Sequence, residues 1–272
     1  MPPVTASPVA RRRPRPLRAA PVLLALSLAA CATGRLPDRE PLITDRPDFT
    51  ESAQSVPARM VQVESGYTYS DDDGVVSHTV GEVLGRIGIG SRTELRVGIN
   101  SYAVTTVSGV RVTGLEDASL GAKFNLLTGA DHFDLLRPDL ALIVATSVPT
   151  GSSAYGTSAW QPDAKLVVGW TLTDRLAWTS NLNYTYASEG DVRFDQPSFS
   201  TSFGYAVAER VGVYGEYFRI MPESRGAADA GYLNGGVTYL LSPEFQLDAR
   251  LGQGVDGAAA GYFVGLGLSR RW

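Results

Sequence analysis

The sequence contains few of the residues on which metalloproteins and disulfide-linked proteins depend. There is one cysteine, Cys31, and there are two histidines, His78 and His132, among 272 residues. A single cysteine excludes an internal disulfide and a metal site built from cysteines. The formal net charge of -4 gives no support for nucleic-acid binding, which calls for clustered basic charge. We therefore expect no cofactor, no bound metal and no nucleic-acid partner.

Long apolar runs are also missing. No segment after residue 30 has eighteen consecutive apolar residues, so the sequence predicts no transmembrane helix. The apolar run 19–30 follows a cluster of arginines between Arg11 and Arg18. It is too short to cross a bilayer, but it has the length and flanks of a secretory signal. We expect residues 1–30 to be a signal peptide.

The end of this run reads Leu28-Ala29-Ala30-Cys31. It resembles the lipobox of bacterial lipoproteins, whose cysteine receives the lipid after cleavage. The resemblance implies that Cys31 is the lipidation site and the first residue of the mature chain. The alternative is ordinary cleavage at a small residue, with Cys31 incidental, and both interpretations stay open.

The rest of the chain alternates apolar and polar residues with a period of two. Residues 94–100 place Leu95, Val97 and Ile99 between polar residues and glycine, and 164–172, 175–186, 245–251 and 262–269 follow the same pattern. Such alternation predicts β-strands with two unlike faces. A soluble sandwich would bury the apolar face, whereas an outer-membrane barrel would turn it toward lipid.

Four features favour the barrel. A signal segment precedes the strands, and the strands are about ten residues long, as a tilted membrane-crossing strand requires. Aromatic residues fall near strand ends, and the opposite face is too polar to pack on a second sheet. The predicted fold is all-β, a transmembrane antiparallel up-and-down β-barrel of about twelve strands over residues 61–272. The expected strands are 61–70, 78–89, 93–102, 115–126, 137–148, 160–172, 175–187, 192–206, 210–220, 230–241, 244–252 and 259–272.

The links between these strands differ in length. Tight turns are expected at 90–92, 173–174, 208–209 and 242–243, whereas 127–136 is longer and breaks the pattern. The other links are mostly longer and are expected as outer loops at 71–77, 103–114, 149–159, 188–191, 221–229 and 253–258. Outer-membrane barrels have short periplasmic turns. We therefore expect a location in the bacterial outer membrane with both termini in the periplasm.

The chain ends in a strand whose last residue is Trp272. This ending resembles the signal read by the barrel-assembly machinery of outer membranes. The expected partners are membrane lipid, that machinery and a small-molecule solute, and the protein is expected to be a monomer.

The segment before the first strand carries a recognisable motif. Residues 44–50 include Asp-Arg-Pro-Asp, Pro57 follows, and residues 62–67 read Gln-Val-Glu-Ser-Gly-Tyr. This opening resembles an outer-membrane transporter family named for the MetA pathway of phenol degradation. The resemblance implies passage of small aromatic compounds.

Residues 31–60 have two interpretations. Their prolines and charges forbid a regular strand or helix. In the first interpretation the segment folds into the barrel mouth as a plug or gate, and Asp45, Arg46 and Asp48 pair with lumen charges. In the second it is a periplasmic tether without a gating role.

Alternation also turns a set of charged residues toward the lumen. Their mixed signs favour a salt-bridged network that rigidifies a narrow barrel, or a polar constriction that selects solutes. These candidates are Glu64, Arg86, Arg96, Lys123, Glu216, Asp248 and Arg250.

Possible catalytic groups are sparse. Asp71, Asp72, Asp73 and His78 fall together in the expected first outer loop. Such a cluster suits a protease site or a Ca²⁺ site, but a solvated loop is the interpretation we favour. His132 lies near Asp131 and Asp134 in the longer turn, and is expected to be a surface residue. Ser101 approaches the rim without a histidine beside it. We expect no catalytic residue.

The sequence therefore predicts a passive outer-membrane channel for small, hydrophobic or aromatic solutes. A non-conducting structural barrel is the alternative. A membrane-embedded hydrolase is less favoured because histidine is so scarce.

Overall fold

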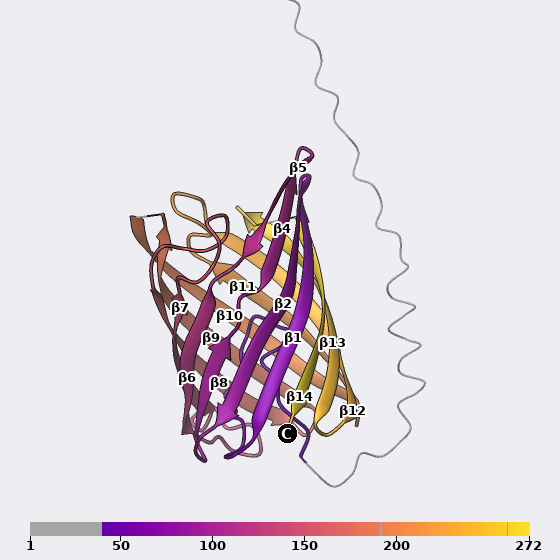
Figure 1. Ribbon diagram of the computed structural model, residues 1–272. Helices are drawn as coiled ribbons and strands as arrows, with labels where there is room; N and C mark the ends of the chain where they lie inside the picture. Colours follow the sequence, from indigo (N-terminus) through magenta and orange to yellow (C-terminus); the bar gives the residue numbers. More distant parts are fainter. Residues whose placement is uncertain (1–39, 191, 260) are drawn as a thin grey trace, which may run out of the picture. The chain divides into compact units, whose positions relative to one another are not determined.

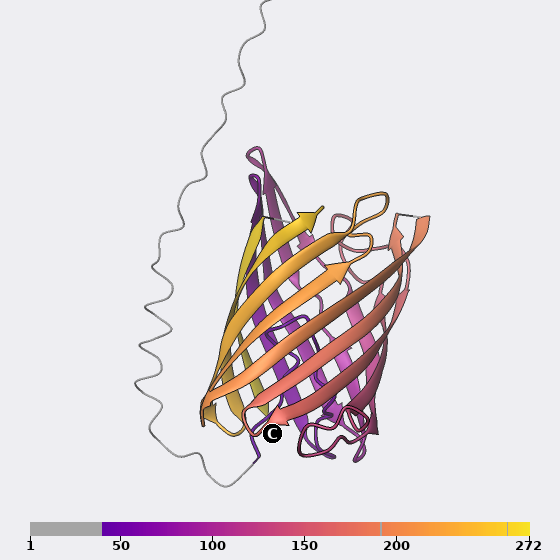
Figure 2. The same ribbon diagram turned by 180° about the vertical axis from the view of Figure 1, so that it is seen from behind.

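The computed structural model describes residues 40–190, 192–259 and 261–272. The expected signal peptide and Cys31 lie outside these residues. The described residues form a closed antiparallel β-barrel with a segment of chain inside it (Figure 1; Figure 2 shows the opposite side). They include no helix long and apolar enough to cross a membrane. The predicted all-β barrel is confirmed.

The wall is built from fourteen strand segments among the described residues. They are β1 (Val61–Asp72), β2 (Val75–Gly88), β3 (Thr93–Gly98), β4 (Tyr102–Val107), β5 (Val110–Leu115), β6 (Ala118–Leu127), β7 (Asp139–Val148), β8 (Gln161–Thr173), β9 (Leu176–Glu189), β10 (Val192–Ala208), β11 (Val211–Ile220), β12 (Ala230–Ser242), β13 (Phe245–Gly257) and β14 (Tyr262–Arg271).

β3 and β4 together form one strand of the barrel, and β5 and β6 together form the next. The lower part of β2 pairs with β3, and its upper part pairs with β4. In the same way, β6 pairs with β3 and β5 pairs with β4. The short interruptions at 99–101 and 116–117 therefore divide the third and fourth strands, and the described wall has the twelve strands predicted. The sheet closes where β1 pairs with β14, from Gln62 opposite Arg271 to Asp71 opposite Tyr262.

The predictions of two outer loops are wrong, and the loops expected at 188–191 and 253–258 are shorter than predicted because β9 runs to Glu189 and β13 to Gly257. Residues 71–77 and 103–114 are not loops, because β1 and β2 continue to a turn at Asp73-Gly74, and β4 and β5 to a turn at Ser108-Gly109. The two residues of each turn have positive φ, 48° and 92° in the first and 49° and 84° in the second. Two-residue hairpin turns with positive φ at both positions match the twist of the flanking strands. The two hairpins rise above the rest of the rim (Figure 1).

The remaining links between strands differ in length at the two ends of the barrel. At the end that carries the C-terminus, β8, β10 and β12 join their successors through only two residues each, and 89–92 and 128–138 are the other links there. At the opposite end lie the longer links 149–160 and 221–229. We call these the turn end and the loop end of the barrel.

Burial in the wall is inverted relative to a soluble protein. Lys123, Arg86 and Glu64 point inward and are fully buried, while outward residues such as Leu182 and Leu266 are each 62% exposed. On the outer surface near the turn end, the rings of Trp170, Trp178 and Phe203 stack in a row. An apolar outer band flanked by aromatic rings is the surface that a bilayer covers.

Candidate functional site

Residues 40–60, here called the plug segment, lie inside the barrel. At the turn end, the Leu42 backbone N–H donates to the Pro243 carbonyl at 2.7 Å, and Arg271 donates to the Glu40 carbonyl at 2.7 Å. The segment rises into the lumen and returns to the same end, where the Arg59 N–H donates to the Gly88 carbonyl at 2.8 Å. It is the dark thread within the barrel in Figure 1. Pro47 and Pro57 keep it from forming a regular strand or helix.

Carboxylates of the wall hold the backbone of the plug segment. Glu64 accepts the Asp45 and Arg46 N–H groups, both at 3.1 Å. Glu94 accepts the Val56 N–H at 2.7 Å. These charge-assisted bonds satisfy backbone donors that have no strand partner within the barrel.

A third wall carboxylate, Glu216, holds the innermost part of the segment. It accepts the Phe49 N–H at 2.9 Å and the Thr50 N–H at 2.5 Å. The Thr50 hydroxyl donates to Ser200 at 2.8 Å. The segment is thus bound at its middle to β10 and β11 as well as at its two ends.

Asp45 is the centre of the ion-pair network. Its carboxylate lies 2.6 Å from Arg96, 2.8 Å from Lys123 and 3.3 Å from Arg86, all inward residues of the wall. Burial by itself would raise the pKa of Asp45, but the three cations hold this pKa well below its ordinary value. Asp45 is therefore an anion under all ordinary conditions.

Glu51 of the plug segment also forms ion pairs with cations of the wall. Its carboxylate lies 2.8 Å from Arg96 and 2.5 Å from Lys165 of β8. Burial opposes ionisation, but these two cations lower the pKa of Glu51 to about 2. The plug segment is consequently tied to β3 and β8 on different parts of the wall.

Arg46 points the opposite way along the wall. It pairs with Glu82 at 2.8 Å and approaches Asp248 at 3.5 Å. Its guanidinium lies over Gly66 and Gly267, where an added Cβ would overlap it. These two glycines face each other on β1 and β14, so together they give Arg46 its place against the wall.

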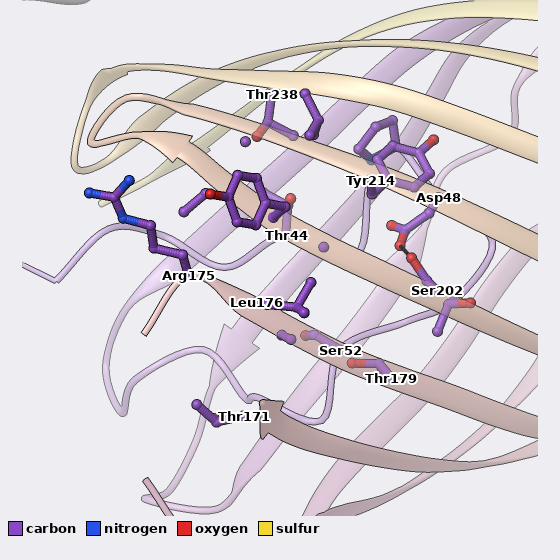
Figure 3. Close-up of a pocket in the computed structure, with 18 of the residues that line it drawn as sticks. Thr44, Asp48, Ser52, Thr171, Arg175, Leu176, Thr179, Ser202, Tyr214 and Thr238 are labelled. Carbon is purple, nitrogen blue, oxygen red and sulfur yellow. Dashed lines mark hydrogen bonds between the residues drawn. The ribbon is translucent and has the colours of Figure 1, made fainter. Parts of the chain in front are cut away.

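Asp48 has different surroundings. It accepts a hydrogen bond from the Ser202 hydroxyl at 3.2 Å. Withdrawal from water, with the nearby Glu216 carboxylate, raises the pKa of Asp48 well above its ordinary value. Asp48 also lines a cavity of about 510 Å³ between the plug segment and the walls of β8–β12. Figure 3 shows Asp48, Ser202 and Tyr214 around this space, with Thr179 and Thr238 on neighbouring strands.

The structure places all seven predicted lumen residues against the plug segment. Glu64, Arg86, Arg96, Lys123 and Glu216 contact its side chains or backbone directly. Asp248 faces Arg46, and Arg250 donates to the Pro47 carbonyl at 2.9 Å. Of the three segment residues predicted to pair with lumen charges, Asp45 and Arg46 do so. The prediction is wrong for Asp48, which accepts a hydrogen bond from Ser202 and lies beside the Glu216 carboxylate.

Sequence reasoning missed four further members of this network, Glu51, Glu82, Glu94 and Lys165. Glu94 and Lys165 stand at inward positions of the alternation beside Arg96 and Val167, so the signal was present in the sequence. Glu82 has the same parity as Arg86, so the alternation placed it inward as well; the bulge, where Gly81 and Glu82 adopt positive φ of 104° and 40°, shifts the β1–β2 register only beyond it.

The other candidate groups are not assembled into a centre. Asp71 and Asp72 belong to β1 and His78 to β2, which corrects the loop assignment, and His78 Nδ1 lies 2.8 Å from the Tyr67 hydroxyl. His132 lies in the link 128–138. In the part of the chain that the structure describes, no three His, Cys, Asp or Glu residues gather as a metal site would require.

The family model described as "Putative MetA-pathway of phenol degradation" matches residues 44–272. The chain belongs to this family. The match begins within the plug segment, at residue 44, and runs to the last residue, so it includes residues from both parts of the site. It confirms the resemblance seen in residues 44–67. No curated protein is similar enough in sequence to match.

Solved structures agree with this phenol-degradation family assignment at the level of fold. An outer membrane channel from Pseudomonas putida F1 superposes with a TM-score of 0.65 and 13% identity, covering 81% of this chain and 98% of that chain. The NanC porin gives a TM-score of 0.51 and 11% identity, covering 77% and 98%. At these identities the similarity establishes an outer-membrane-type β-barrel.

Proposed function

We propose that the protein is a passive channel of the bacterial outer membrane for small hydrophobic or aromatic solutes, and that the plug segment closes it. The observation that carries this proposal is the way the segment is held. It fills part of the lumen through side-chain and charge contacts, while the wall closes by its own β1–β14 pairing. The segment can therefore move without breaking the barrel.

The contents of the lumen suit small solutes. Cations and anions alternate around the plug segment, so the lumen has no uniform field that would favour one sign of ion. A cavity of about 510 Å³ beside the segment is within the range of small-molecule sites. The family description supports an aromatic class of solute.

The orientation belongs to the same proposal. Outer-membrane barrels carry short turns on the periplasmic side, and the two-residue links of this protein lie at the turn end together with Trp272. We place that end in the periplasm, so that the segment closes the channel from inside. The C-terminal strand is proposed as the element that the assembly machinery reads, and the protein as a monomer.

Residues 1–30 are proposed as a signal peptide, with lipidation at Cys31. The support is the arginine-rich start, the short apolar run and the cysteine at its end. Mass measurement of the mature N-terminal peptide tests this. A lipid-sized increment on a peptide beginning at Cys31 supports lipidation, and an unmodified cysteine refutes it.

A disulfide tether tests the channel and its plug together. The hydroxyls of Thr50 and Ser200 are 2.8 Å apart, so Thr50→Cys with Ser200→Cys, in a chain with Cys31→Ser, should join the segment to the wall. We expect uptake of phenol by liposomes to fall to the level of empty liposomes when the tether is oxidised, and to recover on reduction.

The matched control joins two wall strands instead. Ser77 and Thr105 are opposite each other on β2 and β4, with hydroxyls 3.1 Å apart, and a disulfide there should leave uptake unchanged. If the oxidised segment tether conducts as well as the reduced one, the segment is not the gate. If no form admits solute above empty liposomes, the protein is the non-conducting structural barrel.

A further inference from the structure

Three aromatic rings stack inside the lumen, and one of them belongs to the plug segment. Phe49 lies parallel to Phe218 of β11, with ring centroids 4.5 Å apart and an angle of 11° between the planes. Phe218 stacks on Tyr232 of β12 at 4.8 Å and 14°. Phe263 of β14 closes the far side at 6.3 Å, tilted by 59°.

This stack is unexpected where it lies. The lumen of an outer-membrane barrel is normally polar, and the network around Asp45 follows that rule. Phe218 and Tyr232 are nevertheless inward and only 7% and 5% exposed, with Ala230 beside them. Apolar rings inside the wall add nothing to the lipid-facing surface. Their role must be sought in the lumen.

Phe49 is the removable member of the stack. Its ring is only partly buried, and its backbone N–H is held by Glu216. The other rings belong to strands whose partners are fixed by the sheet. When the plug segment leaves the lumen, one face of Phe218 is uncovered, and the Glu216 carboxylate loses the Phe49 and Thr50 N–H donors while it keeps the Asn234 amide at 2.9 Å. A flat apolar face beside a carboxylate that can accept further hydrogen bonds is then open to solute.

We propose that Phe218 and Tyr232 form a stacking site for a planar aromatic solute, and that Phe49 occupies this site while the segment is docked. A solute ring would stack on Phe218 as Phe49 does, and a hydroxyl on that ring would replace the Phe49 N–H as the donor to Glu216. This inference rests on the proposed channel function. It names the solute as a monocyclic aromatic with a hydroxyl donor.

Binding of solute at this site is coupled to release of the plug segment. Phe49 and the solute exclude each other on Phe218, so bound solute favours release of the segment, and release of the segment favours binding of solute. An aromatic pair contributes about 0.5–1.5 kcal/mol beyond its buried area. Removing the Phe49 ring should therefore strengthen solute binding by roughly 2- to 12-fold, since 1.4 kcal/mol corresponds to a factor of ten.

The test is binding of phenol to the full refolded chain in detergent micelles, followed by saturation-transfer NMR. Phe49→Ala should raise the affinity for phenol. Phe218→Leu in the Phe49→Ala chain should abolish that gain, and Tyr232→Phe, which keeps the ring, should preserve it. Cyclohexanol, which has the hydroxyl without the aromatic face, should bind Phe49→Ala no better than the parent.

The matched control is Phe203→Leu, which removes an aromatic ring from the outer surface. It should leave phenol binding unchanged. Equal phenol affinity in the parent and in Phe49→Ala would overturn the proposal, as would an equal effect of Phe203→Leu and Phe218→Leu. Because Phe49 lies on the plug segment, its variant remains informative even if Phe218→Leu does not fold.

The result is separable from that of the liposome experiment. Binding in micelles requires no passage across a membrane. If the Thr50–Ser200 tether blocks uptake while Phe49→Ala leaves phenol binding unchanged, the channel stands and the ring site falls. If phenol binds as expected but nothing crosses, the ring site stands and the channel falls.

Discussion

Two aspartates three residues apart on the plug segment meet opposite surroundings. Asp45 faces three cations and has a lowered pKa, whereas Asp48 lies beside the Glu216 carboxylate and has a raised pKa. Asp45 therefore stabilises the docked segment when it is ionised. Asp48 stabilises it when it is protonated, because its charge would be both desolvated and repelled.

This difference predicts a pH dependence of docking. A raised pKa in the docked state gives Asp48 a contribution that is complete below its ordinary pKa of about 3.9 and is lost as the pH rises through the raised value. Ionised Glu51 also stabilises the docked segment. Because its pKa is lowered to about 2, this contribution is lost only as the pH falls toward that value. We expect docking to strengthen as the pH falls through the raised pKa of Asp48, measured as slower proteolysis of the plug segment by a protease of broad pH range.

Asp48→Asn removes the titrating group and keeps the shape of the side chain. In this variant the proteolysis rate at neutral pH should fall toward the acid rate, and its dependence on pH should flatten. The parent protein with an unfolded substrate supplies the correction for protease activity. An Asp48→Asn profile as steep as that of the parent would assign the pH dependence to another group.

At the scale of single elements, β1 and β14 form the surface on which Arg46 of the plug segment packs. Gly66 and Gly267 are opposite each other, and the Arg46 guanidinium lies over both. A side chain at either glycine would occupy the space of that guanidinium. Glu82, which lies in the bulge on β2, pairs with the same arginine at 2.8 Å.

Gly66→Val should displace Arg46 from this surface. Overpacking of a filled site costs about 1–3 kcal/mol. Here this cost weakens docking of the plug segment and leaves the pairing of the strands intact. We expect faster tryptic cleavage in the plug segment by roughly 5- to 150-fold, by the conversion of 1.4 kcal/mol per factor of ten. Mass spectrometry of the fragments identifies the cut.

Gly204→Val is the matched control, since Gly204 also lies within a strand and lines the cavity, but has open space where its Cβ would be. It should leave cleavage of the segment unchanged. Equal acceleration by both variants would mean that valine disturbs the strands and not the seat of Arg46.

At the scale of the molecule, the wall and the plug segment are separable. Many wall charges already pair with each other, as Arg86 does with Glu64 and Glu94, both at 2.9 Å. Arg96 and Glu94 are also 2.9 Å apart. The wall therefore retains partners for part of its inward charge when the segment is absent.

Deletion of residues 40–60 should leave a folded barrel that conducts more than the full chain. The expected readouts are a retained heat-dependent shift in gel mobility and faster phenol uptake by liposomes. Lys123 and Lys165 lose Asp45 and Glu51, so some loss of thermal stability is expected. A deleted chain that folds but takes up phenol no faster than the full chain would contradict the role of the segment as the closure.

The sequence by itself determined the barrel, its twelve strands and the seven inward charges, because a strand has a strict period of two and every second residue must face the same side. Glu82, Glu94 and Lys165 were within reach of the same rule. The motif in residues 44–67 carried the family. The hairpin turns were signalled by Asp73-Gly74 and Ser108-Gly109, although the longer loops expected there are absent.

Only the tertiary structure decided what lies inside. Alternation says that a residue faces inward but not which residue it meets, since partners such as Asp45 and Lys123 are joined across the lumen rather than along a strand. The pairing of Glu82 with Arg46, the contact of Arg46 with Gly66 and Gly267 and the stack of Phe49 on Phe218 all depend on how the closed sheet brings distant strands together. Closure of the sheet forms the lumen, and it also determines which wall residues the plug segment contacts there.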